Sequence, residues 1–355
     1  MICGLIKRVC VNLIKEINKM LKRMPWEHNL EIIKSIEPAM RYKGGDFAAW
    51  QSEARAKLAE LLGLHNIHRS ENNNFTIEYK KECEGYDEYR FTLEPEEGFV
   101  FPCVMRVPHG AKAPIPVILT LQGHSTGMHI SLGQPIFEKD PITISGGDRD
   151  FVVRAVKEGF AAIAIEQRNF GECGGKRTGG PDCHVSSMSA IINGRTTIGE
   201  RVIDTMTVID ALSNFDFLDR ENVMLMGNSG GGTATFYTAA IDERIKLAMP
   251  SCAVCTYKHS IAAMEHCVCN FVPNIARYFD MGDIGGLIAP RNLIVVNGKQ
   301  DNIFPDEGVR ETMDIIKPLY AAAGAPDSCA LVTGPEGHRF YADLSWPLVH
   351  KMSGK

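Results

Sequence analysis

The sequence predicts an α/β fold, in which a mostly parallel central sheet with antiparallel N-terminal strands is flanked by helices and preceded by a helical N-terminal extension. From residue 75, three segments alternate apolar and polar residues with a period near two, which is typical of antiparallel strands. After Pro116, short continuous apolar runs alternate with helix-length segments, as expected for parallel strands buried on both faces. The antiparallel segments are 75–79, 88–93 and 99–107, the apolar runs are 117–121, 161–165, 223–226, 245–249, 293–296 and 330–332, and the main helical segments are 197–214, 231–241 and 306–323.

The first 24 residues predict an amphipathic helix, because apolar residues recur three or four positions apart with lysines and arginines between them. Lys7 and Arg8 interrupt what would be the apolar core of a signal peptide, and no apolar run reaches the length of a membrane span. We therefore expect a cytoplasmic protein. Such a helix could lie on a membrane surface or on a partner. The more common arrangement is a helix packed on its own domain or on a neighbouring copy in a homo-oligomer.

Composition excludes some classes of function. The 355 residues are 45% hydrophobic and 23% charged, which is ordinary for a globular protein. With 38 Lys and Arg against 43 Asp and Glu, the formal charge of −5 provides no basic field for nucleic acid.

The 11 cysteines show no regular disulfide framework and fit reduced thiols. Cys252-x-x-Cys255 with Cys267-x-Cys269 could form a zinc site, but the second spacing is one residue short of the usual two. We expect neither a metal nor an organic cofactor.

Ser229 is the candidate nucleophile. It lies in Gly227-Asn-Ser-Gly-Gly231, between the apolar run ending at Met226 and a helical segment, which is the strand, turn and helix context of a nucleophile elbow. In a chain with 33 glycines the motif alone arises easily by chance, and a serine-capped turn is the alternative. The strand, the helix and suitable partners downstream favour the nucleophile.

Asp301 and His338 are the candidate partners of Ser229. A serine hydroxyl needs a base, and the base needs an orienting carboxylate. Each candidate follows a buried run, at the end of the strand where α/β sheets place their sites. The order serine, acid, histidine is the one this strand–turn–helix context requires. Asp306 is a rival acid but stands where a helix N-cap is expected, and the rival histidines, for which we expect surface, cap or core positions, are His184, His259, His266 and His350.

Acyl transfer also requires hydrogen-bond donors for the developing oxyanion, generally two backbone N–H groups. Gly230 follows the nucleophile and supplies one. The loop Gln122-Gly-His-Ser-Thr-Gly127 follows the run 117–121, and we expect the N–H of His124 to supply the other.

At these motifs the chain resembles α/β-hydrolases of the acetyl-xylan-esterase-like or dienelactone-hydrolase-like branch. The likeness lies in 122–127, 166–172, 194–201, 227–232, 298–301 and 337–338, and extends from about residue 75 onward. It implies that the Gln167-Arg168 loop and Glu200-Arg201 support the rim of the site, the alternative being a structural ion-pair network. Dienelactone hydrolases use a cysteine nucleophile, so their substrate does not transfer to a chain with Ser229.

The resemblance implies a helical extension over residues 1–70 and an α/β-hydrolase catalytic domain over 71–355, with cap segments at 127–150 and 253–285. The expected function is a serine esterase that uses Ser229, His338 and Asp301 on a small acyl group, carried on a small molecule or a carbohydrate. The alternatives are a peptidase or acylaminoacyl hydrolase of the same fold, and an inactive hydrolase-fold binding protein.

Overall fold

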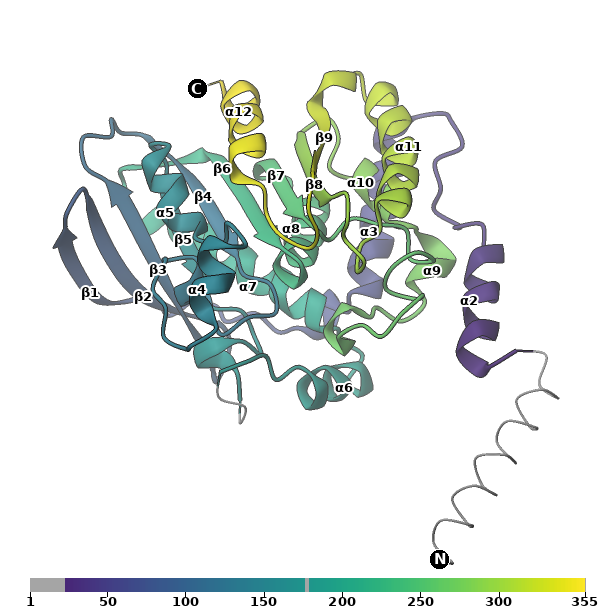
Figure 1. Cartoon of the computed structure of the whole chain (residues 1–355), viewed down its shortest axis with the longest axis horizontal. Helices are drawn as coiled ribbons and strands as arrows, with labels where there is room; N and C mark the ends of the chain where they lie inside the picture. The colour runs from purple at the N-terminus through teal and green to yellow at the C-terminus, as the bar shows by residue number, and fades with distance from the viewer. Residues whose placement is uncertain (1–22, 176–178, 355) are drawn as a thin grey trace, which may run out of the picture.

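The computed structural model describes residues 23–175 and 179–354, and in these residues one sheet has the strand order β1-β2-β3-β5-β4-β6-β7-β8-β9 (Figure 1). β1 to β3 pair antiparallel and β3 pairs antiparallel with β5, whereas all pairs from β5 to β9 are parallel. The predicted fold class is therefore confirmed. The strands are β1 (Thr76–Cys83), β2 (Tyr86–Glu96), β3 (Phe99–Pro108), β4 (Ile115–Leu121), β5 (Ala161–Ile165), β6 (Leu218–Asn228), β7 (Ile245–Ser251), β8 (Asn292–Gly298) and β9 (Cys329–Gly334).

Helices cover both faces of this sheet. α5 and α12 pack on one face, where they contact β3 to β5 and β7 to β9 respectively, and α7, α8 and α11 pack on the other (Figure 1). The helices are α2 (Pro25–Ser35), α3 (Phe47–Leu61), α4 (Asp140–Ser145), α5 (Phe151–Lys157), α6 (His184–Ile192), α7 (Thr197–Ala211), α8 (Gly230–Ile241), α9 (Ile275–Tyr278), α10 (Met281–Gly286), α11 (Asp306–Ala322) and α12 (Ala342–Ser353). None of the described helices is both long and apolar enough to cross a membrane.

The continuous apolar runs are explained by burial on both faces. In β6, Val223 and Leu225 belong to the hydrophobic cluster on the α7 and α8 side, whereas Met224 and Met226 belong to the cluster on the α5 and α12 side. Because successive side chains point to opposite faces, a strand with both faces covered needs an apolar residue at every position.

The sequence pattern underestimated β6, which begins at Leu218 rather than at residue 223. Its first residues include Arg220 and Glu221, which are exposed, and its pairing with β4 shifts register between Pro116 and Val117. Hydrophobic runs reveal only the buried part of a strand, so this polar start carried no signal.

The N-terminal helices belong to the same core as the sheet. Leu58 of α3 is fully buried in the cluster that contains α7 and α8, and Arg55 donates hydrogen bonds to the carbonyls of Ala240 and Leu287. The two segments expected as caps, 127–150 and 253–285, contain short helices: α4 lies in the first, α9 lies in the second, and α10 begins in the second and ends at Gly286. The amphipathic helix expected over the first 24 residues lies outside the described residues, except for residues 23 and 24.

We predict that Leu58→Ala lowers the free energy of unfolding by about 2–5 kcal/mol, because it removes a fully buried side chain and leaves a cavity in the hydrophobic cluster that α3 shares with α8. Urea denaturation followed by circular dichroism measures the change. Leu344→Ala is the matched control: Leu344 is half exposed on α12, and its replacement should change stability by no more than about 0.5 kcal/mol. Equal effects of the two substitutions would show that α3 is not part of the core.

Candidate active site

Ser229 lies at a sharp turn between β6 and α8. Its backbone has φ 56° and ψ −125°, a conformation that non-glycine residues rarely adopt and that tends to occur at functional sites. Glycine is required on both sides of the turn. A Cβ on Gly227 would lie 2.5 Å from the Gly231 carbonyl oxygen, and one on Gly231 would lie 2.1 Å from the Leu121 carbonyl oxygen. The sequence therefore produces an elbow that presents the serine at the start of a helix.

Asp301 and His338 lie together after β8 and β9. Nδ1 of His338 is 2.8 Å from Oδ2 of Asp301, whose side chain is fully buried, while the imidazole remains 18% exposed. The other carboxylate oxygen of Asp301 accepts hydrogen bonds from the backbone N–H groups of Ile303 and Phe304. Burial raises the pKa of Asp301, but the hydrogen bond with His338 and these N–H groups outweigh it and hold the pKa below its ordinary value. Asp301 is therefore a fixed, ionised acceptor for one nitrogen of the imidazole.

The elbow and the histidine loop are neighbours, although no hydrogen bond joins the Ser229 hydroxyl to the His338 imidazole within the described residues. The Ser229 N–H donates to the Ser251 carbonyl at the end of β7. The next residue, Cys252, has its sulfur within 4.8 Å of the paired atoms of Asp301 and His338. Burial, followed by the charge of Asp301, raises the pKa of Cys252 to about 12, so that this thiol stays neutral beside the pair.

Arg149 links the two loops directly, and no sequence motif predicted this role. Its Nη2 donates to the His338 carbonyl at 3.3 Å. In the orientation of the Asn228 amide that satisfies its neighbours, the same nitrogen donates at 3.0 Å to the side-chain oxygen of Asn228, the residue before the nucleophile. Phe304 is a second residue without a sequence signal, and its ring stacks on His338 at 5.9 Å between centroids.

The two predicted oxyanion residues are also adjacent. Gly230 is the first residue of α8, so its N–H has no partner within the helix. His124 follows β4, and its ring packs so closely on Gly230 that a Cβ there would lie 2.7 Å from Cε1 of the imidazole. Gly123 approaches Ser229 in the same way, with a Cβ position 2.9 Å from the serine Cβ. The structure thus brings the loop after β4 against the elbow.

The rival residues have other partners. His350 lies 2.7 Å from Glu158, His259 lies 3.6 Å from Glu311, and His184 begins α6. Asp306 pairs with Arg310 at 2.7 Å. The sequence predicted Asp306 as the N-cap of this helix, but Pro305 occupies the cap position and Asp306 is the first residue of α11. His266 differs from these, since its ring packs edge-on against Phe304 and so borders the site.

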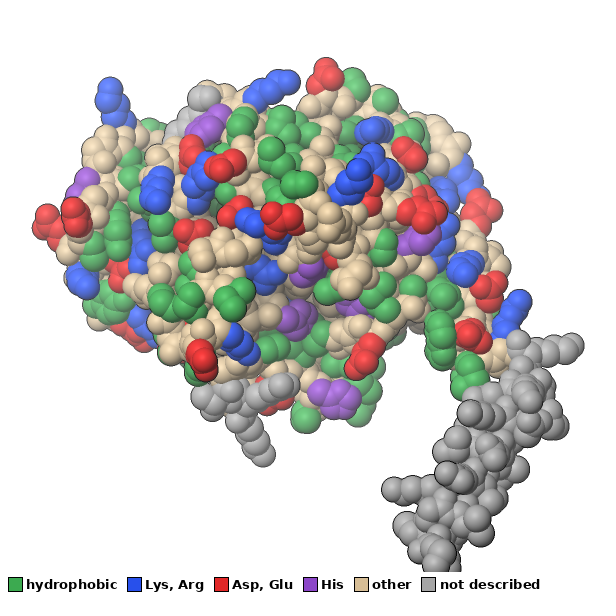
Figure 2. Space-filling view, in the orientation of Figure 1, with side chains coloured by type: hydrophobic (Ala, Val, Ile, Leu, Met, Phe, Trp, Pro, Cys, Tyr) green, Lys and Arg blue, Asp and Glu red, His purple; other side chains and the backbone are tan. Residues whose placement is uncertain are grey.

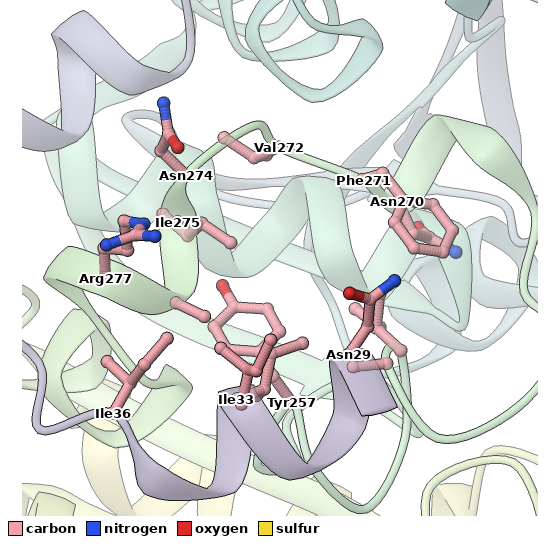
Figure 3. A pocket seen from close by; sticks show the side chains of 14 residues that line it. Asn29, Ile33, Ile36, Tyr257, Asn270, Phe271, Val272, Asn274, Ile275 and Arg277 are labelled. Atoms are coloured by element: carbon pink, nitrogen blue, oxygen red, sulfur yellow. The ribbon is translucent and has the colours of Figure 1, made fainter. Parts of the chain in front are cut away.

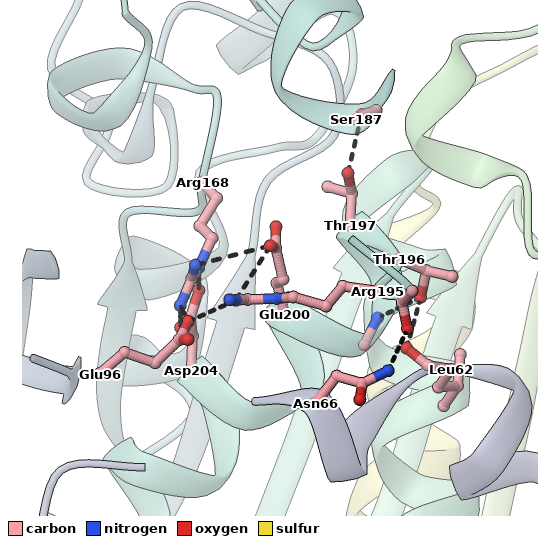
Figure 4. Close-up of polar contacts among 12 residues, drawn as sticks. Leu62, Asn66, Glu96, Arg168, Ser187, Arg195, Thr196, Thr197, Glu200 and Asp204 are labelled. Atoms are coloured by element: carbon pink, nitrogen blue, oxygen red, sulfur yellow. Dashed lines mark hydrogen bonds and ion pairs between the residues drawn. The ribbon is translucent and has the colours of Figure 1, made fainter. Parts of the chain in front are cut away.

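Arg168 and Glu200 belong to an ion-pair network (Figure 4). Arg168 donates two hydrogen bonds to Asp204, at 2.8 and 2.9 Å, and a third to Glu96 at 2.6 Å. The Arg195 guanidinium pairs with Glu96 at 2.6 Å and with Glu200 at 3.0 Å, and so joins these two carboxylates. These pairs connect β2, the loop after β5 and α7, which supports the structural alternative for the Arg168 loop and Glu200.

Glu166 ties the loop after β5 to the loop after β4. Its carboxyl group is 2% exposed and accepts hydrogen bonds from the N–H groups of Met128 and Glu172. It also lines a cavity of about 420 Å³ together with Thr126 and His129. Burial raises the pKa of Glu166 to about 8, so that it is mostly protonated at neutral pH.

Another cavity, of about 300 Å³, lies between α2 and residues 270–277 and includes Ile33, Tyr257 and Phe271 (Figure 3). None of its lining residues is a predicted catalytic residue.

The outer surface carries interspersed acidic and basic side chains on the face shown in Figure 2, where histidine side chains gather near the middle.

Two groups of described residues bring potential metal-ligand atoms within 4.8 Å of one another. One consists of Cys252 with the acid–histidine pair. The other comprises His124, Cys183, Cys267 and Cys269. The four cysteines considered from the sequence as an alternative zinc site do not come together, since Cys252 and Cys255 do not join Cys267 and Cys269.

The sheet order, the strained serine between β6 and α8, and an acid–histidine pair after β8 and β9 define an α/β-hydrolase fold. The chain belongs to the Abhydrolase family, whose model matches residues 18–333, and is thereby a hydrolase by class. The resemblance inferred from the sequence motifs is confirmed for family and fold.

Known proteins agree with this assignment. "Putative hydrolase YtaP" of Bacillus subtilis (strain 168) is 25% identical over 244 residues, which cover 67% of this chain and 77% of that protein. The crystal structure of a "putative acetyl xylan esterase" from Bacteroides fragilis NCTC 9343 is similar with a TM-score of 0.77 at 17% identity, covering 92% of this chain and 95% of that one. A glucuronoyl esterase from Solibacter usitatus has a TM-score of 0.67 at 16% identity, with 90% and 97% covered. At these identities the solved structures show the fold.

We predict that Glu166→Gln reduces the fall in stability as the pH rises from about 5 to 8. The pKa of Glu166 is raised from 4.5 to about 8, so in this range the folded protein keeps a proton that the unfolded chain loses. This group therefore destabilises the fold as the pH rises, by a few kcal/mol at most. Melting temperatures of both proteins across this range measure the difference, with Glu82→Gln on the exposed β1 as control. Parallel pH curves for wild type and Glu166→Gln would contradict a protonated Glu166.

Proposed function

We propose that the chain is a serine esterase that cleaves carboxylic esters through an acyl-enzyme, with Ser229, His338 and Asp301 as the catalytic triad. The observation that carries this proposal is the 2.8 Å contact between His338 Nδ1 and the buried Asp301, beside a serine held at φ 56°. The contact fixes the tautomer in which Nδ1 carries the proton and Nε2 is free to act as a base.

In this mechanism, Ser229 attacks the ester carbonyl while His338 accepts the hydroxyl proton. The bond to the alcohol then breaks, and His338 gives the proton to the departing alkoxide. Water enters, His338 removes one of its protons, and the resulting hydroxide attacks the acyl carbonyl. The bond to Ser229 then breaks, His338 returns the proton to the serine oxygen, and the acyl group leaves as a carboxylic acid. This chemistry needs no metal or organic cofactor at the reacting atoms.

The backbone N–H groups of Gly230 and His124 are the proposed oxyanion donors. Support comes from the N–H of Gly230, which has no partner within α8, and from the packing of the His124 ring on Gly230. Donors aimed at the oxyanion stabilise charge that develops only in the transition state.

The proposed substrate carries a small acyl group, such as acetyl, on a carbohydrate or another small alcohol. This step rests on similarity to the proteins named as acetyl xylan esterase and glucuronoyl esterase, both of which are esterases of carbohydrates by name. The segments 127–150 and 253–285 are the proposed caps that set the choice of acyl group and alcohol.

We predict that Ser229→Ala abolishes labelling by a fluorophosphonate probe and lowers kcat on p-nitrophenyl acetate by at least about 10⁴-fold, because the nucleophile is lost. Asp301→Asn should lower kcat by a similar factor while leaving KM nearly unchanged, since the wrong tautomer of His338 is then favoured. Gel fluorescence and steady-state kinetics measure these changes.

Ser213→Ala, at an exposed position, is the matched control and should label and turn over like the wild type. If Ser229→Ala still labels and hydrolyses the ester, the nucleophile is another residue. If the wild type itself never labels, the chain is an inactive hydrolase-fold protein.

The class of substrate is tested by comparing p-nitrophenyl esters of two to eight acyl carbons with acetylated xylo-oligosaccharides and aminoacyl p-nitroanilides. We expect kcat/KM to be highest for acetyl esters, at least about tenfold above the octanoyl ester, because a small acyl pocket excludes the longer chain. Faster turnover of the anilides than of the esters would instead identify a peptidase or acylaminoacyl hydrolase.

A further inference from the structure

A cluster of sulfur and nitrogen atoms lies behind the loop that follows β4. Cys183 comes from the start of α6, Cys267 and Cys269 come from the segment between β7 and α9, and His124 comes from the loop after β4. Their ligand atoms all lie within 4.8 Å of one another. We propose that these four residues bind one Zn²⁺ ion as a structural site.

The distances fit a single tetrahedral ion. His124 Nε2 lies 3.1 Å from the sulfur of Cys269, which lies 3.4 Å from the sulfur of Cys267. In tetrahedral zinc sites the Zn–S bond is about 2.3 Å, so sulfur ligands lie about 3.8 Å apart, and a small adjustment of these side chains completes the geometry. A disulfide needs sulfur atoms about 2.05 Å apart, and the cysteines of the cluster are free thiols.

The chemistry of the donor set selects zinc. Three thiolates and one imidazole supply four protein ligands and leave no open position, which is the usual environment of structural Zn²⁺, whereas Mg²⁺ and Ca²⁺ require oxygen ligands. Two of the four ligands are shielded from water, since Cys183 is 5% exposed and Cys269 is fully buried, whereas His124 and Cys267 are partly exposed. Binding displaces three thiol protons to solvent.

Arg201 supplies independent support from its charge. Its guanidinium is buried, and within residues 23–175 and 179–354 it forms no ion pair with a carboxylate. Instead it points at Cys269 and Cys183, at 3.7 and 3.9 Å, donates to the Arg168 carbonyl and lies over the Phe170 ring. One Zn²⁺ with three thiolates and a neutral imidazole carries a charge of −1, which the guanidinium neutralises. Burying an arginine without a directly paired carboxylate destabilises the fold, and the proposed anionic site would offset this loss of free energy.

The ion would also hold the His124 ring in place against Gly230, since Nε2 faces the sulfur atoms and Cε1 faces the glycine. An effect of this packing on catalysis rests on the proposed function, in which the N–H groups of His124 and Gly230 bind the oxyanion. The metal itself is four-coordinate and does not touch the substrate, so His124 acts here as a positioning residue.

The test begins with the metal content of the full-length wild type, purified without chelator and measured by plasma mass spectrometry. We expect about one zinc per chain, and less than about a tenth of that in Cys183→Ser and His124→Ala. Cys255→Ser, which removes a buried thiol outside the cluster, and Cys329→Ser are the matched controls and should retain the full zinc content. These readouts do not depend on any catalytic activity.

Because a ligand variant could fail to fold, the wild type provides a second measurement. Replacement of zinc by Co²⁺ should produce visible bands of tetrahedral cobalt with thiolate-to-cobalt charge transfer, and removal of zinc by a chelator should lower the melting temperature. The proposal is overturned if the wild type binds no zinc after dialysis against an equimolar amount, if the ligand variants keep their zinc, or if mass spectrometry finds a disulfide within the cluster.

Discussion

Burial of the parallel strands on both faces is the constraint on which the rest of the structure depends. It leaves few polar positions in the buried parts of β4 to β9, so most polar chemistry is placed where these strands end. Parallel pairing then places these ends beside one another: Leu121 pairs with Gly227, Asn228 with Ser251, and Gly298 with Gly334. The loops that carry the proposed nucleophile, acid, base and oxyanion donors therefore leave the sheet at one edge.

The same constraint explains why much of the fold could be predicted from the sequence. A strand buried on both faces is a continuous apolar run, and the residue at which the run ends marks the edge of the sheet that carries the proposed site. Asp301 and His338 each follow such a run, which is why local pattern alone brought them forward as partners. The sequence pattern did not predict the exposed start of β6 or the N-cap of α11 at Pro305, because neither feature depends on hydrophobic burial.

The features that could not be predicted from the sequence are those that depend on contacts between segments far apart in the chain. Arg149 joins Asn228 to the His338 loop across 79 and 189 residues of chain, and no spacing rule connects them. The same holds for Cys183, which lies in a different part of the chain from Cys267 and Cys269. Motif spacing grouped Cys252 and Cys255 with Cys267 and Cys269 because it compares neighbours in sequence, whereas folding brings His124 and Cys183 to Cys267 and Cys269 from two other segments.

The buried arginines show how charge organises the region behind the site. Arg168 is balanced by Asp204 and Glu96, an arrangement that connects three elements through carboxylates. Arg201 points at Cys269 and Cys183 instead, and the proposed thiolates would balance its charge. The loop after β4 is held at two points. Glu166 accepts a hydrogen bond from the N–H of Met128, and the His124 ring contacts the sulfur cluster. A loop held at both ends keeps its backbone N–H groups in position before a substrate arrives, which is the condition under which such groups stabilise an oxyanion most effectively.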